Sequence, residues 1–278
     1  RPARRVTLII VMMDEAREAL ARFFGTKDPG CYVFTRNTTE GLNTAAYGFG
    51  LGKGDAVVTT DAEHNSNHVP WLRLAETVGI ERRMTRSAED GSFDIESFKS
   101  IMDRKVKVVS IQHANNVTGI TVPVKDVAEI AHDYGATVVV DGAQAAPHMK
   151  VDLGELGADI YCMSIHKMLG PSGMGVMYGN EETLKRLRPL SLGGGTVGLG
   201  LGDLPDGGDE RIDLLLGVVD VRGGAGAPFD PTGHVERMGA VHARADHDAA
   251  HAVEHHPDIV GSKTVDVERE HASALRTV

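Results

Sequence analysis

Short apolar segments rich in valine and isoleucine alternate with amphipathic segments of helical periodicity from about residue 14 to about residue 195. Continuous runs of β-branched residues are typical of strands that are buried on both faces, as in a parallel sheet covered by helices. The alternation therefore predicts an α/β fold with a mostly parallel sheet flanked by helices. The expected strands are residues 31–35, 55–60, 105–112, 136–141, 158–164 and 175–179, and the clearest helices are residues 14–24, 39–50 and 124–135.

The first thirteen residues do not continue this pattern. A basic start, RPARR, precedes the apolar run VTLIIVMM, but no small-residue cleavage site follows, so we interpret the run as core or as a poorly matched start, and not as a secretion signal. The chain opens on Arg1 and not on Met, and we expect its natural beginning to be missing. We therefore treat residues 1–13 as a separate segment and begin the large domain at residue 14.

Residues 203–278 have a different composition from the rest of the chain. Trp and Tyr are absent, Phe229 is the only Phe, and seven of the thirteen histidines lie here among many Asp, Gly and Ala residues. Few large apolar side chains leave little area to bury, so we expect an atypical tail that is disordered or results from a shifted reading frame. His247, His251 and His255 would share one helical face, but without supporting carboxylates or cysteines they predict no metal site.

The overall composition excludes several classes of protein. A formal net charge of −10 argues against a general nucleic-acid binder, which needs a basic surface to neutralise phosphates. No apolar segment is long enough to span a membrane. Cys31 and Cys162 are the only cysteines and have no metal-ligand spacing, so the composition favours a protein of the reducing cytoplasm.

Polar residues follow several of the expected strands. Lys167 lies between the strand 158–164 and a turn rich in glycine, at a strand's carboxyl end, where open α/β sheets bind ligands. The segment TRNTTEGLN starts a helix whose free amide groups favour an anion. Taken alone, each such residue has a simpler interpretation as a turn residue, a helix cap or a loop residue. The other residues expected to converge on the same crevice are Thr38, Thr39, His64, Asn116, Asp141 and Gln144.

Taken together, these residues match the needs of pyridoxal phosphate chemistry: an amine, a carboxylate for the ring nitrogen, a histidine and an anion-binding helix start. At these positions the sequence resembles the class V aminotransferase family of fold-type I pyridoxal-phosphate enzymes, and within it the SUF-type cysteine desulfurases and selenocysteine lyases. The resemblance covers roughly residues 14–195 in unbroken order. Its blocks are FTRNTTEGLN, EHNSNHVPWLRL, HANNVTGITVPVKDVAEIAHDYGA, VDGAQAAPHMKVDLGELGADIY and SIHKMLGPSGMGVMYG.

The resemblance implies a role for each candidate residue. Lys167 would bind the cofactor covalently, Asp141 would pair with the pyridine nitrogen, and His64 would stack on the ring. The ring hydroxyl would be contacted by Asn116 and Gln144, and the phosphate by Thr38, Thr39, Ser164 and His166. The implied reaction converts L-cysteine into L-alanine with transfer of sulfur for iron–sulfur cluster assembly. A small amino-acid substrate, L-cysteine or a relative, a sulfur-acceptor protein and a homodimer are implied with it.

The resemblance stops at both ends of the chain. The family's carboxyl-terminal small domain carries an arginine that binds the substrate carboxylate and, in desulfurases, a reactive loop cysteine, and neither has a recognisable counterpart after residue 202. Three interpretations therefore stay open. The chain is a cysteine desulfurase-like protein, truncated and impaired; or a class V aminotransferase or other pyridoxal-phosphate lyase; or an inactive remnant of the fold that serves as an interaction module.

Overall fold

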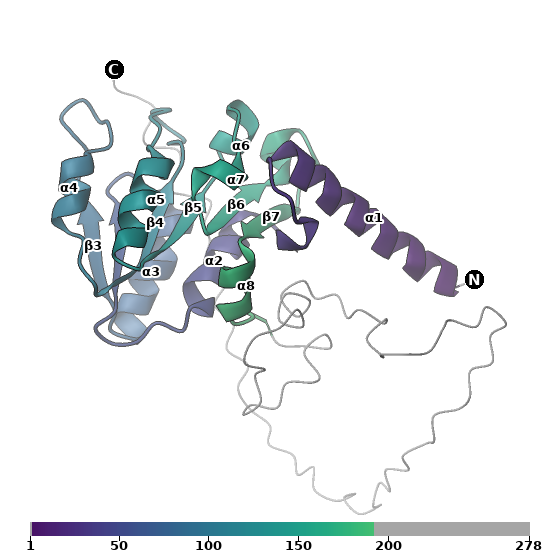
Figure 1. Cartoon of the computed structure of the whole chain (residues 1–278), viewed down its shortest axis with the longest axis horizontal. Coiled ribbons are helices and arrows are strands. Elements are labelled where there is room, and N and C mark those ends of the chain that lie inside the picture. The colour runs from purple at the N-terminus through teal and green to yellow at the C-terminus, as the bar shows by residue number, and fades with distance from the viewer. Residues whose placement is uncertain (1, 192–278) are drawn as a thin grey trace, which may run out of the picture. The chain divides into compact units, whose positions relative to one another are not determined.

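A computed structural model of the chain describes residues 2–191 (Figure 1), and side chains from residue 11 onward. The expectations for the tail, including the boundary near residue 202, the small domain and the histidines at 247, 251 and 255, lie outside these residues.

The described residues form a seven-stranded sheet in the order β1-β7-β6-β5-β4-β2-β3. Neighbouring strands from β3 to β6 are parallel, and β7 alone runs antiparallel to both of its neighbours, β6 and β1. The connection from β6 to β7 is too short for a crossover helix, so this pair must be antiparallel. The strands are β1 Tyr32–Thr35, β2 Ala56–Thr60, β3 Glu81–Thr85, β4 Val106–Gln112, β5 Thr137–Asp141, β6 Ile160–Ser164 and β7 Gly175–Gly179.

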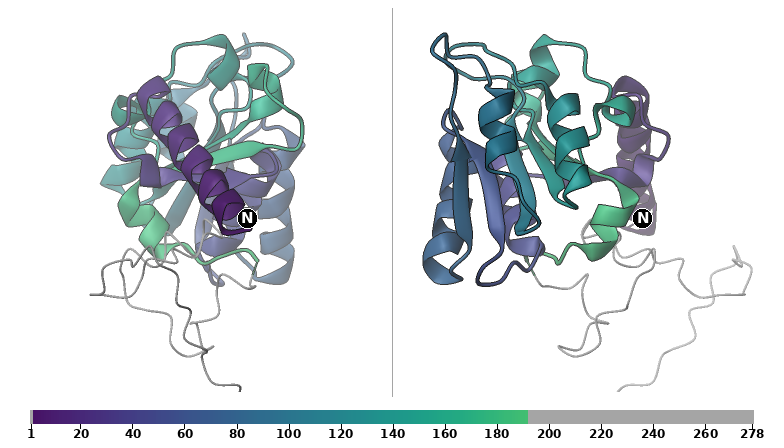
Figure 2. Two further views of the ribbon diagram at one scale, coloured as in Figure 1. Left: turned by 90° about the vertical axis from the view of Figure 1, so that its right-hand side faces the viewer. Right: turned by 60° about the vertical axis from the view of Figure 1, so that its left-hand side comes forward.

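Helices cover both faces of the sheet (Figure 2). One core lies under α2, α3 and α8, and the other lies under α1, α4, α5, α6 and α7. The central strand β5 shows why both faces are apolar, because Val138 and Val140 belong to one core while Val139 belongs to the other. The helices are α1 Pro2–Phe23, α2 Thr38–Gly48, α3 Asn65–Thr77, α4 Ile95–Ser100, α5 Val124–Asp133, α6 Ala145–His148, α7 Leu153–Leu156 and α8 Glu181–Arg186, with 3-10 turns η1 Pro29–Cys31 and η2 Ile165–Met168.

The first helix begins earlier than the helix predicted at residues 14–24. α1 begins at Pro2 and not at residue 14, because after Pro2 no proline or glycine interrupts the chain until Gly25, which takes a left-handed φ of 71°. The run VTLIIVMM is therefore helical. We interpreted this run as core or as a poorly matched start; of its described side chains, Val11 and Met12 are 43% and 58% exposed.

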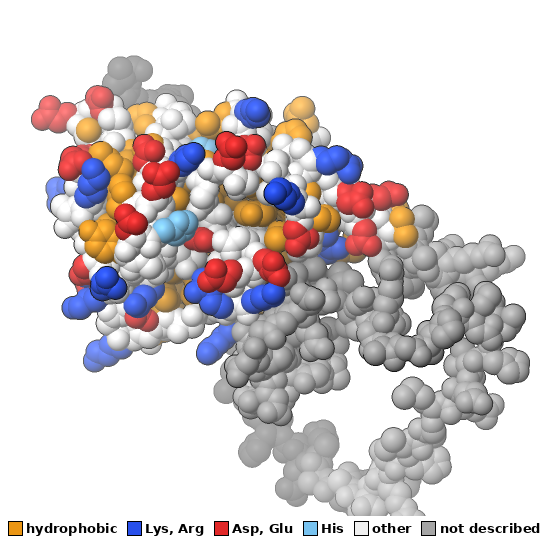
Figure 3. Space-filling view, viewed as in Figure 1, with side chains coloured by type: hydrophobic (Ala, Val, Ile, Leu, Met, Phe, Trp, Pro, Cys, Tyr) orange, Lys and Arg blue, Asp and Glu red, His pale blue; other side chains and the backbone are white. Residues whose placement is uncertain are grey.

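None of the helices within residues 2–191 combines the length and apolar character that crossing a membrane requires. On the face shown in Figure 3, the basic and acidic side chains of the described residues are interspersed.

Candidate functional site

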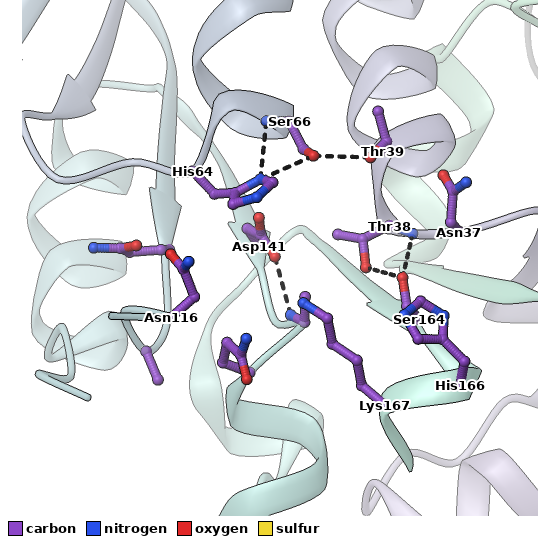
Figure 4. A pocket seen from close by; sticks show the side chains of 14 residues that line it. Asn37, Thr38, Thr39, His64, Ser66, Asn116, Asp141, Ser164, His166 and Lys167 are labelled. Carbon is purple, nitrogen blue, oxygen red and sulfur yellow. Dashed lines mark hydrogen bonds between the residues drawn. The ribbon is translucent and has the colours of Figure 1, made fainter. Parts of the chain in front are cut away.

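A pocket of about 310 Å³ opens at the carboxyl ends of the parallel strands, and Figure 4 shows its lining. The position follows from the topology, because β1, β2, β4, β5 and β6 all point their carboxyl ends to this edge while β7 starts there. All nine residues selected from the sequence line it. They are Thr38, Thr39, His64, Asn116, Asp141, Gln144, Ser164, His166 and Lys167.

Five further residues line the pocket but were not predicted as site residues from the sequence: Asn37, Ser66, Gln112, Ala114 and Ala143. Two of them carried a local signal. Asn37 stands three residues before Glu40 at a helix start, and Ser66 stands two residues after His64, which are spacings of helix capping. The other three follow only from their position at or after the end of a strand.

The amino-terminal end of α2 forms one wall of the pocket. Asn37 caps the helix by accepting a hydrogen bond from the Glu40 amide at 2.9 Å. The Thr38 amide donates to Ser164 Oγ at 2.9 Å, and the hydroxyls of Thr38 and Ser164 lie 2.7 Å apart. These contacts join the start of α2 to the end of β6. The helix dipole and its first amides make this wall attractive to an anion.

Gly175 permits this close approach of helix and sheet. A Cβ at position 175 would lie 2.5 to 2.7 Å from the Asn37 backbone atoms Cα, C and N. The Asn37 backbone could move away from such a Cβ only by displacing the first turn of α2.

We expect Gly175→Ala to destabilise the protein by about 1–3 kcal/mol, the usual cost of overpacking. Gly52→Ala is the matched control, because its Cβ would meet only Asp55 Oδ2 at 3.8 Å, and we expect a change within about 0.5 kcal/mol. Urea unfolding of the two variants measures the difference. Equal midpoints would show that the contact at Gly175 relaxes freely.

His64 caps α3 and is held by a short chain of hydroxyl groups. The Ser66 amide donates to His64 Nδ1 at 3.1 Å, so Nδ1 is an acceptor and a neutral ring carries its proton on Nε2. Ser66 Oγ lies 3.0 Å from Nδ1 and 2.8 Å from Thr39 Oγ1. The chain connects the starts of α2 and α3 and orients the imidazole at the pocket (Figure 4).

Asp141 is the last residue of β5 and lies buried at the inner end of the pocket. Burial raises the pKa of its carboxyl group, while a 3.0 Å hydrogen bond from the Ala143 amide and the charges of Lys167 and His64 act in the opposite direction. A buried carboxylate of this kind seeks a positively charged partner.

Lys167 lies in η2, immediately after β6, and its side chain extends toward Asp141 (Figure 4). Within the described residues, no hydrogen bond or ion pair holds its Nζ atom. Leu169, two residues later, is fully exposed and is the only described non-glycine residue with a left-handed φ, at 65°. This strained turn reverses the chain directly after the lysine, as is common at functional sites.

Neither cysteine of the chain lies in this pocket. Both are buried free thiols. Burial, aided by the nearby Asp28 carboxylate, raises the pKa of Cys31 to about 12, and burial raises that of Cys162 well above its ordinary value. Thiols in this state are poor nucleophiles near neutral pH.

The part of the chain that the structure describes has no cluster of three His, Cys, Asp or Glu side chains suited to a metal ion.

Solved structures with the same fold include cysteine desulfurases. CsdA of Escherichia coli superimposes with a TM-score of 0.65 at 29% identity, covering 75% of this chain and 57% of that chain. The apo cysteine desulfurase of Thermococcus onnurineus NA1 gives a TM-score of 0.64 at 35% identity, covering 74% and 55%. The described fold is therefore the large domain of the fold-type I pyridoxal-phosphate enzymes.

Sequence comparison gives the family. The Aminotransferase class-V family matches residues 4–199, and the chain belongs to this family. The match begins at residue 4, inside the segment 1–13 that the resemblance was expected to leave out. Curated relatives include probable cysteine desulfurases of Halalkalibacterium halodurans and Staphylococcus aureus, each 43% identical over 184 and 187 residues, or 65% and 66% of this chain. The chain spans about 45% of the length of these relatives.

Proposed function

We propose that residues 14–202 form the pyridoxal-phosphate-binding large domain of a cysteine desulfurase-like protein. The observation that carries this proposal is that Lys167, Asp141 and the start of α2 all line the same pocket. An amine, a buried carboxylate and an anion-binding helix end are the three groups that this cofactor requires of a protein.

The residues of the pocket fit the cofactor in their chemistry. When bound, pyridoxal phosphate supplies an aldehyde that condenses with amines and a pyridine ring that withdraws electrons from an amino acid. Asp141 would hold the proton on the ring nitrogen, and Lys167 would hold the cofactor covalently. Thr38, Thr39, Ser164 and His166 would bind the phosphate, His64 would stack on the ring, and Asn116 with Gln144 would contact the ring hydroxyl.

The proposed substrate is L-cysteine or a related small amino acid, and the proposed products are L-alanine and sulfur for iron–sulfur cluster assembly. The support is the identity of 43% with probable cysteine desulfurases. A sulfur-acceptor protein, a homodimer and a cytoplasmic location belong to the same proposal, and the two free thiols agree with a reducing compartment. An aminotransferase or another lyase of class V would use the same pocket.

The inactive remnant is a second proposal that a specific observation favours. The two cysteines of the chain are both buried, with pKa values raised far from neutrality, so neither is suited to accept sulfur. Release of alanine and sulfide from L-cysteine above the background of free pyridoxal phosphate decides between the two proposals. A rate equal to that background would support the remnant.

The cofactor assignment is tested by covalent trapping. We expect the full chain, loaded with pyridoxal phosphate and reduced with borohydride, to carry one phosphopyridoxyl group on the peptide that contains Lys167. Mass spectrometry of the digested protein locates the group. Modification spread over exposed lysines such as Lys107, with no excess at Lys167, would contradict the assignment.

A further inference from the structure

Glu63 stands immediately before His64 and is not part of the pocket's lining. Its carboxylate accepts three hydrogen bonds from three different elements. Oε1 accepts from the Thr60 hydroxyl of β2 at 2.7 Å and from the Gln112 amide of β4 at 3.0 Å. Oε2 accepts from Asn67 Nδ2 of α3 at 2.7 Å. A side chain tied to the ends of two strands and the first turn of a helix fixes these three elements relative to one another.

The orientation of Asn67 shows that this arrangement calls for a carboxylate. Trp71 Nε1 can only donate, and it lies 3.3 Å from Asn67 Oδ1, which also accepts from Ser110 Oγ at 2.6 Å. The Nδ2 group of Asn67 must therefore face Glu63. Asn67, Trp71 and Ser110 are all fully buried, so a mismatch in this network is costly.

Asp141 belongs to the electrostatic environment of Glu63. The strand pairing sets Gln112, which donates to Glu63, opposite Asp141 in the adjacent strand. Burial raises the pKa of Glu63 to about 7; the hydrogen bonds from Thr60, Asn67 and Gln112 lower it, and the Asp141 charge raises it. Glu63 is thus protonated below about pH 7 and ionised above it. The three hydrogen-bonding groups are not titratable, and Asp141 is the charged group that acts on Glu63.

We propose that Glu63 is a positioning residue of the pocket: it fixes the His64 ring at the start of α3 and adds a second negative charge behind Asp141 that favours a protonated cofactor nitrogen. The inference rests on the proposed function, because it assigns a role toward pyridoxal phosphate. His64 is held at the pocket by the first turn of α3, and Glu63 attaches that turn to β2 and β4. The two carboxylates together make the inner end of the pocket more negative than Asp141 alone.

The test uses the full chain loaded with pyridoxal phosphate that is labelled with nitrogen-15 in the ring. Glu63→Gln removes the charge and leaves the side-chain NH2 groups of positions 63 and 67, which are both donors, facing each other. The matched control Glu63→Gln with Asn67→Asp restores every donor and acceptor and keeps one negative charge in the network. The nitrogen signal is followed by NMR from pH 5 to pH 10 in all three proteins.

For the wild type we expect a small inflection near pH 7, from Glu63, and a ring nitrogen that keeps its proton to a higher pH. In E63Q the inflection should disappear and the nitrogen should lose its proton at least half a pH unit earlier, about a threefold change in proton affinity. The double variant should recover the wild-type behaviour of the nitrogen.

Two results would overturn the inference: an E63Q titration identical to that of the wild type, or a double variant that behaves like E63Q. If E63Q does not fold, the wild-type curve decides, since a curve without the inflection near pH 7 rules out the charge effect. Failure of the wild type to bind pyridoxal phosphate would instead contradict the proposed function, so the two failures are distinguishable.

Discussion

Replacing Lys167 by alanine is expected to abolish the borohydride-stable attachment of pyridoxal phosphate and to lower any turnover of L-cysteine about a thousandfold or more. The physical reason is that Lys167 is the one described amine that lines the pocket. The fold should survive, because no described hydrogen bond or ion pair depends on Lys167 Nζ. Absorption spectra before and after borohydride reduction, with cysteine turnover, measure the effect.

The control for this prediction is Lys107→Ala. Lys107 is exposed on β4 and contacts the Arg104 carbonyl oxygen, so its loss should leave cofactor attachment unchanged. The Lys167→Ala protein should still bind the cofactor weakly through the start of α2, and added methylamine should restore part of the spectrum. An unchanged reducible absorption band in Lys167→Ala would show that another residue binds the cofactor.

Buried strands could be predicted from the sequence because burial on both faces requires runs of apolar residues, which are visible in the sequence. β4, β5 and β6 are covered on both faces, so each contains consecutive apolar residues: 108–109, 138–140 and 160–163. The edge strand β3 was missed, since its residues Arg82 and Arg83 are only half-buried and its pattern is that of a surface. Helix α3 was missed for a different reason, because Pro70 inside it argues locally against a helix.

The nine candidate residues of the pocket could be predicted because they lie at strand ends and helix starts, which share one edge of a parallel sheet. The partners that orient them could not. Ser66 depends on Thr39, which lies in another helix, and Glu63 depends on Gln112 in a strand far along the chain. Contacts of this kind arise only when the crossovers bring separate segments together, and no local pattern marks them.

Asp141→Asn should change stability and function in opposite directions. Burial raises the pKa of Asp141 above the ordinary aspartate value. At a pH between these two pKa values, the folded apo protein still holds a proton on Asp141 that the unfolded chain has released. The stability of the folded state therefore falls as the pH rises through this range. Asparagine carries no charge and can still accept the Ala143 hydrogen bond. The apo variant should therefore melt at a higher temperature than the wild type at pH 8, and the difference should shrink toward pH 4.

Cofactor chemistry should suffer from the same substitution, because an amide cannot hold the proton on the pyridine nitrogen as a carboxylate does. We expect turnover to fall by about a hundredfold or more, as when an aligned electrostatic group is removed from a reacting centre, while attachment to Lys167 persists. Glu89→Gln, which removes an exposed charge, should alter neither property. A misfolded variant would lose stability and turnover together. Higher stability together with lower turnover would therefore identify Asp141 as a group whose burial lowers the stability of the apo protein. The positively charged ring of the bound cofactor would offset this cost. A lower melting temperature for Asp141→Asn at pH 8 would reject that role.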